Sequence, residues 1–261
     1  MLRISYKSLI VINEGTVMDQ PNVLEAQKLT KVYEDGLCAL DHVSFSVKAG
    51  EIFCLLGDNG AGKTTTINLF LGFLNPTEGT PFINGIDVTK DPLAAKQHVA
   101  YLSDVVMLYP NFTARQNLDF FARIGGRHNL KRDDYYNVLR QVGLQEKAFE
   151  QRLKGFSKGM RQKVGLAIMI VKEAPAIILD EPTSGLDPKA ANEFLAILHQ
   201  LRAQGRAVLI STHDIFRAKE ISDTVGIMSE GKLLAVKTRA ELEHENLERL
   251  YLDYIQGKVA A

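Results

Sequence analysis

The sequence predicts an α/β fold: a mainly parallel sheet forms the core, with an N-terminal antiparallel β subdomain and an inserted helical subdomain. Two observations lead to this class. In the second half of the 261-residue chain, short apolar runs alternate with helical patterns, an order typical of parallel strands joined by helical crossovers. Residues 113–172, in contrast, show mainly helical periodicity, which indicates a helical insertion between two halves of the core.

The composition restricts the class of protein. Hydrophobic residues make up 46% of the chain and charged residues 24%, as in ordinary globular proteins. Lys plus Arg and Asp plus Glu both number 31, so the basic excess typical of nucleic-acid binding is absent and no nucleic-acid partner is expected. No apolar run approaches the roughly eighteen residues of a membrane span. Action at a membrane would therefore require another chain.

The two cysteines and the chain ends give further expectations. Cys38 and Cys54 lie in separate predicted strands without metal-ligand spacing, so we interpret both as reduced core residues of a cytoplasmic protein. Residues 1–22 are expected to form a peripheral extension, because their apolar run is too short for a signal peptide. Residues 257–261 are expected to form a short tail. One domain would then cover residues 23–256.

The first half contains the predicted antiparallel strands and the central strand. Runs at 24–33 and 37–47 are β-like and are separated by a Glu-Asp-Gly turn, which favours a hairpin. Residues 52–56 form an uninterrupted apolar run, as expected of a buried strand, and a helical pattern begins at Thr65. Further strands are predicted at the next two apolar runs, 82–83 and 99–102.

The helical insertion begins with a helix start signal. Thr113 and Gln116 have the spacing of a capping box, in which two side chains satisfy free N–H groups at a helix start. A second helix is predicted from Arg132, where apolar residues recur at helical spacing, and Gly143 provides its stop. A third helix is predicted with Ser157 as its N-cap.

The remaining chain alternates between strands and helices. The predicted elements are, in order, a strand at 176–179, a helix after Pro188, strands at 207–210, 225–228 and 232–236, and a terminal helix ending near Ile255. Because strands separated by helical crossovers pair in parallel, this half is expected to supply the parallel part of the sheet.

A phosphate-binding motif lies between the central strand and the helix that follows it. The sequence from Gly57 to Thr64 reads G-x-x-x-x-G-K-T, in the strand-loop-helix context that the mechanism requires. Gly57, Gly60 and Gly62 let the backbone bend so that successive N–H groups point at phosphate oxygens. Lys63 can reach the outer phosphates, and the Thr64 hydroxyl can ligate Mg²⁺. A glycine-rich turn that only joins strand to helix is the less favoured alternative.

Two carboxylates follow the apolar strand at 176–179. Asp180 would face the phosphate-binding loop across neighbouring strands, in position to hold hydrated Mg²⁺. Glu181 could accept a proton from an attacking water. The alternative is a simple polar turn, which the presence of the phosphate-binding loop makes less favoured.

A second anion site is indicated at the start of the third predicted helix. A helix N-terminus with the Ser157 hydroxyl and the flexible Gly159 can bind an anion. The alternative is that Ser157 only caps a core helix, and these residues considered alone favour that reading.

Taken in order, these motifs resemble those of the nucleotide-binding subunit of ABC transporters, closest to the exporter-type ABC-2 class. The resemblance covers residues 24–255, and its six elements occur in the family's order. They are an adenine-stacking aromatic residue (Tyr33), the Walker A loop (57–65), a signature segment (156–162), Walker B (176–181), a D-loop (184–187) and an H-loop (211–214). Six ordered elements are far more specific than any one of them.

The resemblance implies that the chain is an ATPase that binds ATP and Mg²⁺. It implies that Glu181 activates the attacking water, with His213 and Lys63 as further catalytic residues. The implied metal ligands are Thr64, Asp180 and Asp104. The residues implied to contact the nucleotide are Tyr33, Gly57, Asn59, Gly60, Ala61, Gly62, Lys63, Thr64, Thr65, Asp104, Ser157, Gly159, Asp180 and Asp187.

The resemblance also implies partners and a location. Two copies would form a homodimer that sandwiches ATP, with the Walker A loop of one copy facing the signature segment of the other. A separate multi-span membrane permease would receive the motion of the helical subdomain. The chain is then expected at the cytoplasmic face of the cell membrane, as a peripheral subunit that powers transport, with export favoured.

The sequence departs from the family pattern at two places. The signature usually reads L-S-G-G-Q but here reads F-S-K-G-M, which retains Ser157 and Gly159. Asp104 lies where the family usually has Gln, or Glu in some exporters. It keeps an oxygen ligand for metal or water but is shorter than Gln by one methylene.

Two other classes fit less well. Soluble ABC-type ATPases that act on ribosomes, DNA or protein complexes usually carry two cassettes, or long coiled coils between the Walker motifs, and this sequence has neither. A P-loop kinase or GTPase gives no reason for the signature segment or for His213. Residues 223–226 mimic a GTPase switch motif, but no N-K-x-D sequence follows them.

Overall fold

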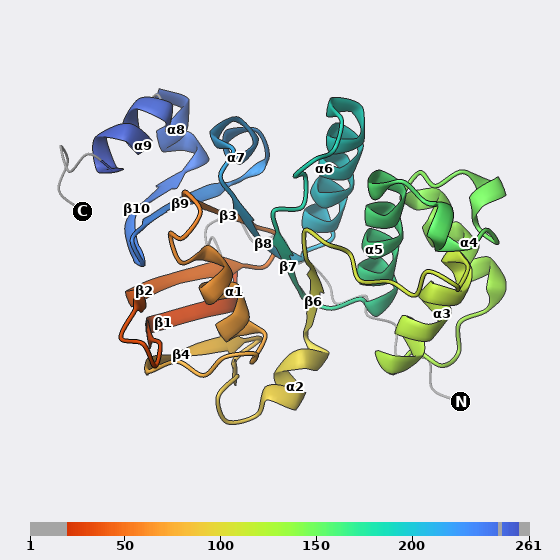
Figure 1. Cartoon of the computed structure of the whole chain (residues 1–261), viewed down its shortest axis with the longest axis horizontal. Coiled ribbons are helices and arrows are strands. Elements are labelled where there is room, and N and C mark those ends of the chain that lie inside the picture. Colours follow the sequence, from red (N-terminus) through yellow and green to blue (C-terminus); the bar gives the residue numbers. More distant parts are fainter. Residues whose placement is uncertain (1–19, 245–246, 256–261) are drawn as a thin grey trace, which may run out of the picture.

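The computed structural model describes residues 20–244 and 247–255. In this part of the chain, two sheets pack on a shared helix, and a group of helices lies beside the larger sheet (Figure 1). Most of the predicted extension at 1–22, and all of the predicted tail at 257–261, lie outside the described residues. The proposed boundaries of a single 23–256 domain stay a prediction.

The elements have the following bounds. The strands are β1 (Asn22–Val32), β2 (Cys38–Lys48), β3 (Ile52–Leu56), β4 (Glu78–Ile83), β5 (Ile86–Asp87), β6 (Val99–Leu102), β7 (Ala176–Asp180), β8 (Ala207–Thr212), β9 (Thr224–Ser229) and β10 (Lys232–Thr238). The helices are α1 (Lys63–Phe70), α2 (Pro92–Gln97), α3 (Ala114–Ile124), α4 (Arg132–Gln141), α5 (Lys158–Lys172), α6 (Pro188–Ala203), α7 (Ile215–Ile221), α8 (Arg239–His244) and α9 (Leu247–Ile255). Two short 3₁₀ helices are η1 (Glu146–Ala148) and η2 (Leu153–Gly155).

The larger sheet confirms the predicted parallel core. Its strand order is β10-β9-β3-β8-β7-β6, with parallel ladders from β6 to β9 and an antiparallel β10 at the edge. All residues of β3 are buried, as expected of the central strand. Leu56 pairs with Thr212, and Asp180 pairs with Ser211, so β3, β8 and β7 end at the same edge. The segments that follow these strands therefore begin close together.

The smaller sheet confirms the predicted antiparallel subdomain and packs against α1, which holds that helix in place. Its strand order is β2-β1-β4-β5, and β1 and β2 form an antiparallel hairpin. Phe45 of β2 stacks on Phe53 of β3, with ring centroids 4.9 Å apart, and its ring lies 5.9 Å from that of Phe70 in α1. These contacts join both sheets and the helix in one buried apolar cluster. The N-terminus of α1 is consequently held at the edge where β3 ends.

The helical subdomain contains α3, α4 and α5, which share an apolar cluster with the other face of the larger sheet. The predicted capping box is confirmed: Thr113 Oγ1 accepts a hydrogen bond from Gln116 N at 3.2 Å, and Gln116 Oε1 accepts one from Thr113 N at 2.9 Å. Gly143 follows α4 with a φ of 68°, the left-handed conformation that commonly ends helices. Ser157 caps α5, because its hydroxyl accepts a hydrogen bond from Met160 N.

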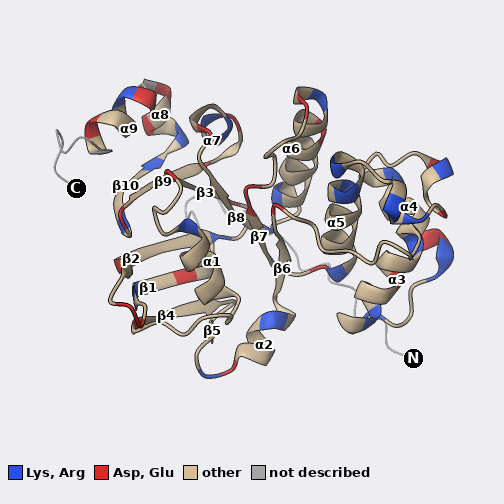
Figure 2. Ribbon diagram, viewed as in Figure 1, with Lys and Arg blue, Asp and Glu red and all other residues tan. Residues whose placement is uncertain are grey.

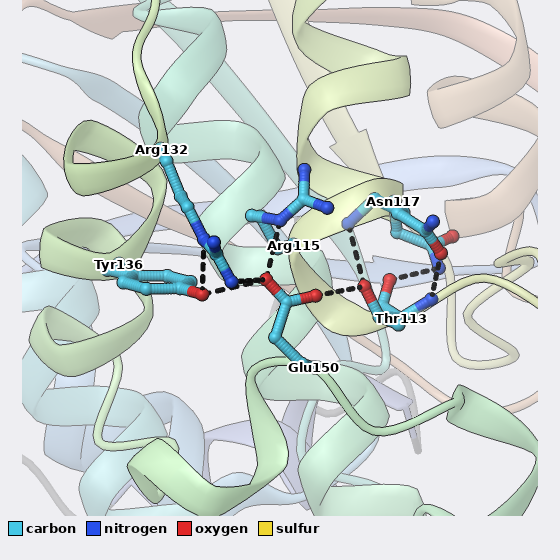
Figure 3. Close-up of polar contacts among 7 residues, drawn as sticks. Thr113, Arg115, Asn117, Arg132, Tyr136 and Glu150 are labelled. Atoms are coloured by element: carbon cyan, nitrogen blue, oxygen red, sulfur yellow. Dashed lines mark hydrogen bonds and ion pairs between the residues drawn. The ribbon is translucent and has the colours of Figure 1, made fainter.

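One carboxylate joins three segments of this subdomain (Figure 3). Glu150 Oε1 accepts hydrogen bonds from Arg115 Nε at 2.7 Å, from Arg132 Nη2 at 3.0 Å and from Tyr136 OH at 2.7 Å. Its other oxygen accepts one from Thr113 Oγ1 at 3.2 Å. Burial acts to raise the pKa of Glu150, but the hydrogen bonds from Tyr136 and Arg115 outweigh it and lower the pKa. The first turns of α3 and α4 are thus tied to the segment that leads to the signature.

The structure corrects one prediction and adds short elements. Cys54 is buried in β3 as expected, but Cys38, the first residue of β2, is exposed, so its interpretation as a core residue is wrong. The sequence patterns also do not predict α2 and α7, which have six and seven residues and are too short for a clear apolar period. Their N-caps, Asp91 and Asp214, accept hydrogen bonds from the first turns and were the available signals.

The surface agrees with the balanced composition. Lys and Arg residues are interspersed with Asp and Glu along the elements (Figure 2). Across residues 20–244 and 247–255, none of the helices has both the length and the apolar character needed to span a bilayer.

Candidate active site

A cleft opens at the edge of the larger sheet where β3 and β7 end. Its volume is about 490 Å³. The segments around it are the loop between β3 and α1, the end of β7, the turn between β9 and β10, and the turn between β1 and β2 (Figure 1). The lining residues are Tyr33, Leu37, Cys38, Ala39, Asp58, Asn59, Gly60, Gly62, Lys63, Thr64, Thr65, Asp180, Glu181, Glu230 and Gly231.

Glycine is required at different positions of the phosphate-binding loop for different structural reasons. A Cβ on Gly57 would lie 2.4 Å from the carbonyl oxygen of Met228, and a Cβ on Gly62 would lie 2.7 Å from that of Ala39. Gly62 also has a φ of +103°. Gly60 has a φ of +87° but open space around its missing Cβ. Thus Gly57 and Gly62 allow the loop to pack on neighbouring backbone, whereas Gly60 supplies the turn that faces the cleft.

Lys63 lies at the base of this loop and is only 6% exposed. Its ammonium donates hydrogen bonds to the carbonyl oxygens of Gly57 and Asp58, the second at 3.0 Å. It also lies 3.8 Å from Glu181 Oε1. A buried ammonium needs such partners. Here they position the Lys63 ammonium between the phosphate-binding loop and the end of β7.

Two oxygen atoms that could coordinate a cation lie close together in the cleft. Thr64 Oγ1 lies 3.3 Å from Asp180 Oδ2, although the two residues are 116 positions apart in the chain. Mg²⁺ in nucleotide sites is usually held by one or two protein oxygens together with waters and phosphates. Thr64 and Asp180 fit this requirement. Among the described residues there is no group of three or more His, Cys, Asp or Glu side chains that would suggest a different metal.

Ser211 is a buried residue that contacts both Asp180 and Glu181; the sequence places it in the H-loop but gives it no role. Its hydroxyl donates a hydrogen bond to Asp180 Oδ1 and accepts one from Glu181 N at 3.2 Å. Ser211 is 0% exposed and pairs with Asp180 in the β7–β8 ladder. Its position two residues before His213, at the end of the predicted strand, was the signal that could have identified it.

Glu181 lines the cleft and contacts His213. The Nδ1 atom of His213 lies 3.0 Å from Glu181 Oε1, and the two side chains are 56% and 20% exposed. Glu181 has a φ of +47°, a left-handed conformation that is uncommon for residues other than glycine. Its backbone N–H is held by Ser211. This unusual backbone turns the chain sharply after β7 and directs the carboxylate toward Lys63 and His213.

Tyr33 also lines the cleft, as does the exposed Cys38. Its hydroxyl is 3.4 Å from Thr65 Oγ1. The sequence missed a further contact, in which Tyr251 of α9 hydrogen-bonds Asp58 of the loop; burial and this bond raise the pKa of Tyr251 to about 12. The C-terminal helix therefore packs directly on the phosphate-binding loop, and no local pattern in the sequence indicates that contact.

Six of the predicted nucleotide-contacting residues do not line this cleft, and two of these, Gly57 and Ala61, belong to the phosphate-binding loop itself. Ser157 and Asp187 are N-caps of α5 and α6, where Asp187 Oδ1 accepts a hydrogen bond from Ala190 N at 2.9 Å. Gly159 lies in the first turn of α5. Asp104 forms an ion pair with Lys158. One copy of the chain therefore brings together the residues of Walker A, Walker B and the H-loop, and leaves the signature segment outside the cleft.

Comparison with known proteins identifies the family. A family model described as ABC transporter matches residues 40–184, which is more than half of the chain. The chain belongs to the ABC transporter family. The match includes the Walker A loop, the signature segment and the Walker B strand of this cassette.

Named relatives of the cassette are ATP-binding proteins. The probable multidrug ABC transporter ATP-binding protein YbhF of Escherichia coli strain K12 is 37% identical over 89% of this chain and 40% of its own length. The bacitracin transport ATP-binding protein BcrA of Bacillus licheniformis is 37% identical over 89% of this chain and 74% of its own. The cassette therefore spans less than half of YbhF and about three quarters of BcrA.

Solved structures share the fold of the cassette. The ATP-binding subunit of an ABC transporter is 31% identical, with a TM-score of 0.79 over 89% of this chain and 99% of that chain. The cassette MJ0796, described as the dimeric structure of a post-hydrolysis state bound to ADP and Pi, has a TM-score of 0.75 over 83% of this chain and 98% of that chain. At 24% identity, MJ0796 supports the fold alone.

We expect the Ser211→Ala substitution to slow ATP hydrolysis roughly tenfold, because residues that orient ligands of a reactive site typically contribute 10- to 100-fold. The lost hydroxyl frees Asp180 and weakens the hold on Glu181. Steady-state phosphate release measures the effect. Ser222→Ala is the matched control, since Ser222 is also buried and its hydroxyl bonds only the carbonyl oxygen of Ala218. Equal rates for both variants would remove Ser211 from this orienting role.

Proposed function

We propose that the cassette is an ATP-hydrolysing subunit that powers transport, with export favoured, through a separate membrane-spanning partner. The observation that carries the proposal is the cleft itself. A phosphate-binding loop, two carboxylates and a histidine converge at one sheet edge, with Glu181 in contact with His213 and close to Lys63. This combination can bind a nucleoside triphosphate and activate water beside its outer phosphate.

The loop would bind the phosphates of ATP. Backbone N–H groups from Gly60 to Thr65 would hold the β- and γ-phosphates at the N-terminus of α1, where the helix dipole favours negative charge. The ammonium of Lys63 would turn from the loop carbonyls to the phosphate oxygens. Thr64 and Asp180 would hold Mg²⁺, which neutralises charge on the β- and γ-phosphate oxygens. Tyr33 would stack on the adenine.

Glu181 would act as the general base. His213 engages its Oε1 atom, so the other carboxylate oxygen is left to accept a proton from the attacking water. His213 would then face the γ-phosphate and stabilise the charge that develops during transfer. Ser211 keeps the backbone of Glu181 in its left-handed conformation, which fixes the direction of attack.

A homodimer would complete the site. The signature residues Ser157 and Gly159, and Asp187 of the D-loop, lie outside the cleft of their own copy. In a head-to-tail pair, the N-terminus of α5 in one copy would meet the γ-phosphate bound by the other. Both halves are present in this chain, so two identical copies are sufficient. The name of the fold neighbour MJ0796 describes a dimeric cassette, which agrees with such an arrangement.

The membrane partner would dock on an apolar groove beside the helical subdomain. This groove has a volume of about 540 Å³ and is bounded by α2, the segment after β6, α3 and α5. Its rim carries Leu93, Met107 and Ile124, which are 74%, 81% and 66% exposed. Exposed apolar clusters of this kind mark interaction surfaces. Docking here would place the cassette peripherally at the cytoplasmic face of the membrane, where closure of the dimer could move the partner.

The names of relatives favour export over other roles. YbhF is a probable multidrug transporter protein, BcrA is a bacitracin transport protein and LnrL of Bacillus subtilis is a linearmycin resistance protein, the last being 33% identical over 84% of this chain and 70% of its own. The second candidate function, a soluble ABC-type ATPase acting on a ribosomal, DNA or protein complex, is less favoured, because these relatives are named as transport or resistance proteins.

We expect Glu181→Gln to keep ATP binding, to trap a dimer and to lower hydrolysis by at least ~10²-fold, the low end for loss of a general base. The amide preserves the shape of the side chain but cannot accept the proton. Nucleotide binding, size-exclusion chromatography and phosphate release measure the three effects. Glu146→Gln is the control, because Glu146 is exposed and pairs only with Arg140. Wild-type turnover in Glu181→Gln would exclude Glu181 as the base.

We expect Met107→Asp to abolish co-purification of the cassette with a multi-span membrane protein from its native membranes. A charge at the rim of the apolar groove would lose its hydration on docking, which costs free energy. ATP hydrolysis by the isolated cassette should change less than about twofold, since the groove is separate from the cleft. Phe216→Asp is the matched control, because Phe216 is 73% exposed on α7, outside the groove. Failure of the unmodified protein to retain any such partner would contradict the transporter assignment.

A further inference from the structure

An ion pair links the segment after β6 to the signature segment. Asp104 Oδ1 lies 2.7 Å from Lys158 Nζ, and the two side chains are 43% and 41% exposed. Lys158 is the first residue of α5 and stands between Ser157 and Gly159. It is the residue by which this signature departs from the glycine of the usual family pattern. Asp104 is another departure, so two residues that differ from the family pattern contact each other.

The same lysine lies against a third segment, the D-loop. A Cβ on Gly185 would be 3.3 Å from Lys158 Nζ and 3.8 Å from its Cδ. Gly185 has a φ of +65° and leaves room for the lysine side chain. The ammonium of Lys158 therefore lies where the segment after β6, the signature and the D-loop meet. The signature and the D-loop contain Ser157, Gly159 and Asp187, which we propose face the nucleotide bound by the other copy.

The position of Lys158 is electrostatically unfavourable without a neighbouring anion. The first turn of a helix carries partial positive charge from its free N–H groups, so a lysine there is repelled. Asp104 offsets this repulsion. Because both side chains are more than a third exposed, water screens the pair and its net contribution is small. An ion pair of this kind can be exchanged readily for a stronger anion, such as a phosphate.

We propose that Lys158 is a second phosphate-binding lysine, which exchanges Asp104 for the γ-phosphate of the nucleotide held by the other copy when the dimer closes. Asp104 is then a positioning residue that holds Lys158 ready and sets how much ATP is needed for closure. The inference rests on the proposed head-to-tail dimer. It assigns to Asp104 a role that differs from metal or water coordination, and the two roles make opposite predictions.

The test measures closure in the Glu181→Gln background, where hydrolysis does not remove the closed dimer. The ATP concentration for half-maximal dimer, in the presence of Mg²⁺, is followed by light scattering. We expect Asp104→Asn to lower this concentration about two- to fivefold, the range set by the energy of an exposed ion pair. Lys158→Gln should raise it. The double variant should match Lys158→Gln alone, because Asp104 acts only through the lysine.

Two controls separate this contact from a general effect of charge. Asp133→Asn and Lys147→Gln remove one charge each from exposed positions of the helical subdomain and should leave the concentration unchanged. Lys158→Arg should restore most of the ATP response, since it retains the cation. With ADP, which lacks the γ-phosphate, Lys158→Gln and the unsubstituted lysine should behave alike. A purely structural role of Lys158 would not depend on the γ-phosphate.

Three results would overturn the inference while leaving the proposed function intact. One is a higher ATP requirement in Asp104→Asn, which would show that the carboxylate acts as a ligand. Another is an unchanged requirement in Lys158→Gln. The third is an additive double variant, which would show that Asp104 acts without Lys158. If Glu181→Gln forms no dimer with ATP at all, both the inference and the proposed dimeric function fail.

Discussion

The parallel pairing of β3, β8 and β7 is the constraint on which the rest of the site depends. Their register places Leu56 beside Thr212 and Asp180 beside Ser211, so the loop, the carboxylates and the histidine all leave the sheet at one edge. Buried apolar clusters on the two faces of the sheet hold that register. A slip of one residue would turn each side chain of a strand to the opposite face of the sheet. The chemistry of the cleft is therefore a consequence of strand packing.

Within this frame, the ATP-binding cassette separates its reactive groups into two surfaces. The cleft is lined by Lys63, Thr64, Asp180 and Glu181, and Glu181 contacts both Lys63 and His213. The signature segment lies at the start of α5, on the helical subdomain. Under the proposed dimer, neither surface would be complete alone, so closure between copies would control hydrolysis. Under the proposed dimer, Lys158 and Asp104 would influence closure without entering the cleft of their own copy.

The sequence predicts those features that local patterns determine. Thr113 with Gln116, Gly143 and Ser157 fix helix ends by short-range hydrogen bonds and backbone conformation, and each is where the pattern places it. The parallel order of the core follows from alternating strands and helices. The convergence of Thr64 and Asp180 could be foreseen because ligands bind at the carboxyl ends of parallel strands.

Other features depend on long-range partners that no local pattern encodes. Cys38 lies in a predicted strand, but whether its side chain is buried depends on which residues of other elements pack on it, and the structure shows it exposed. The partner of Asp104 is 54 residues away in the chain, and Tyr251 reaches Asp58 from the C-terminal helix. The sequence predicts that Gly57 and Gly62 let the loop bend around phosphate, and the structure adds that neighbouring backbone leaves no room for a Cβ at either position. Such contacts are decided by tertiary packing.

The central claim is that two copies of the chain share each site, and a mixing experiment tests it most directly. Lys63→Ala disables every phosphate-binding loop, and Ser157→Arg disables every signature segment, so each variant alone should be inactive. In a mixed dimer, one site combines both defects, but the other pairs an intact loop with an intact signature. Random exchange should restore about a quarter of wild-type ATP hydrolysis for a two-fold symmetric dimer. No recovery on mixing, with both variants folded and exchanging subunits, would contradict the shared site.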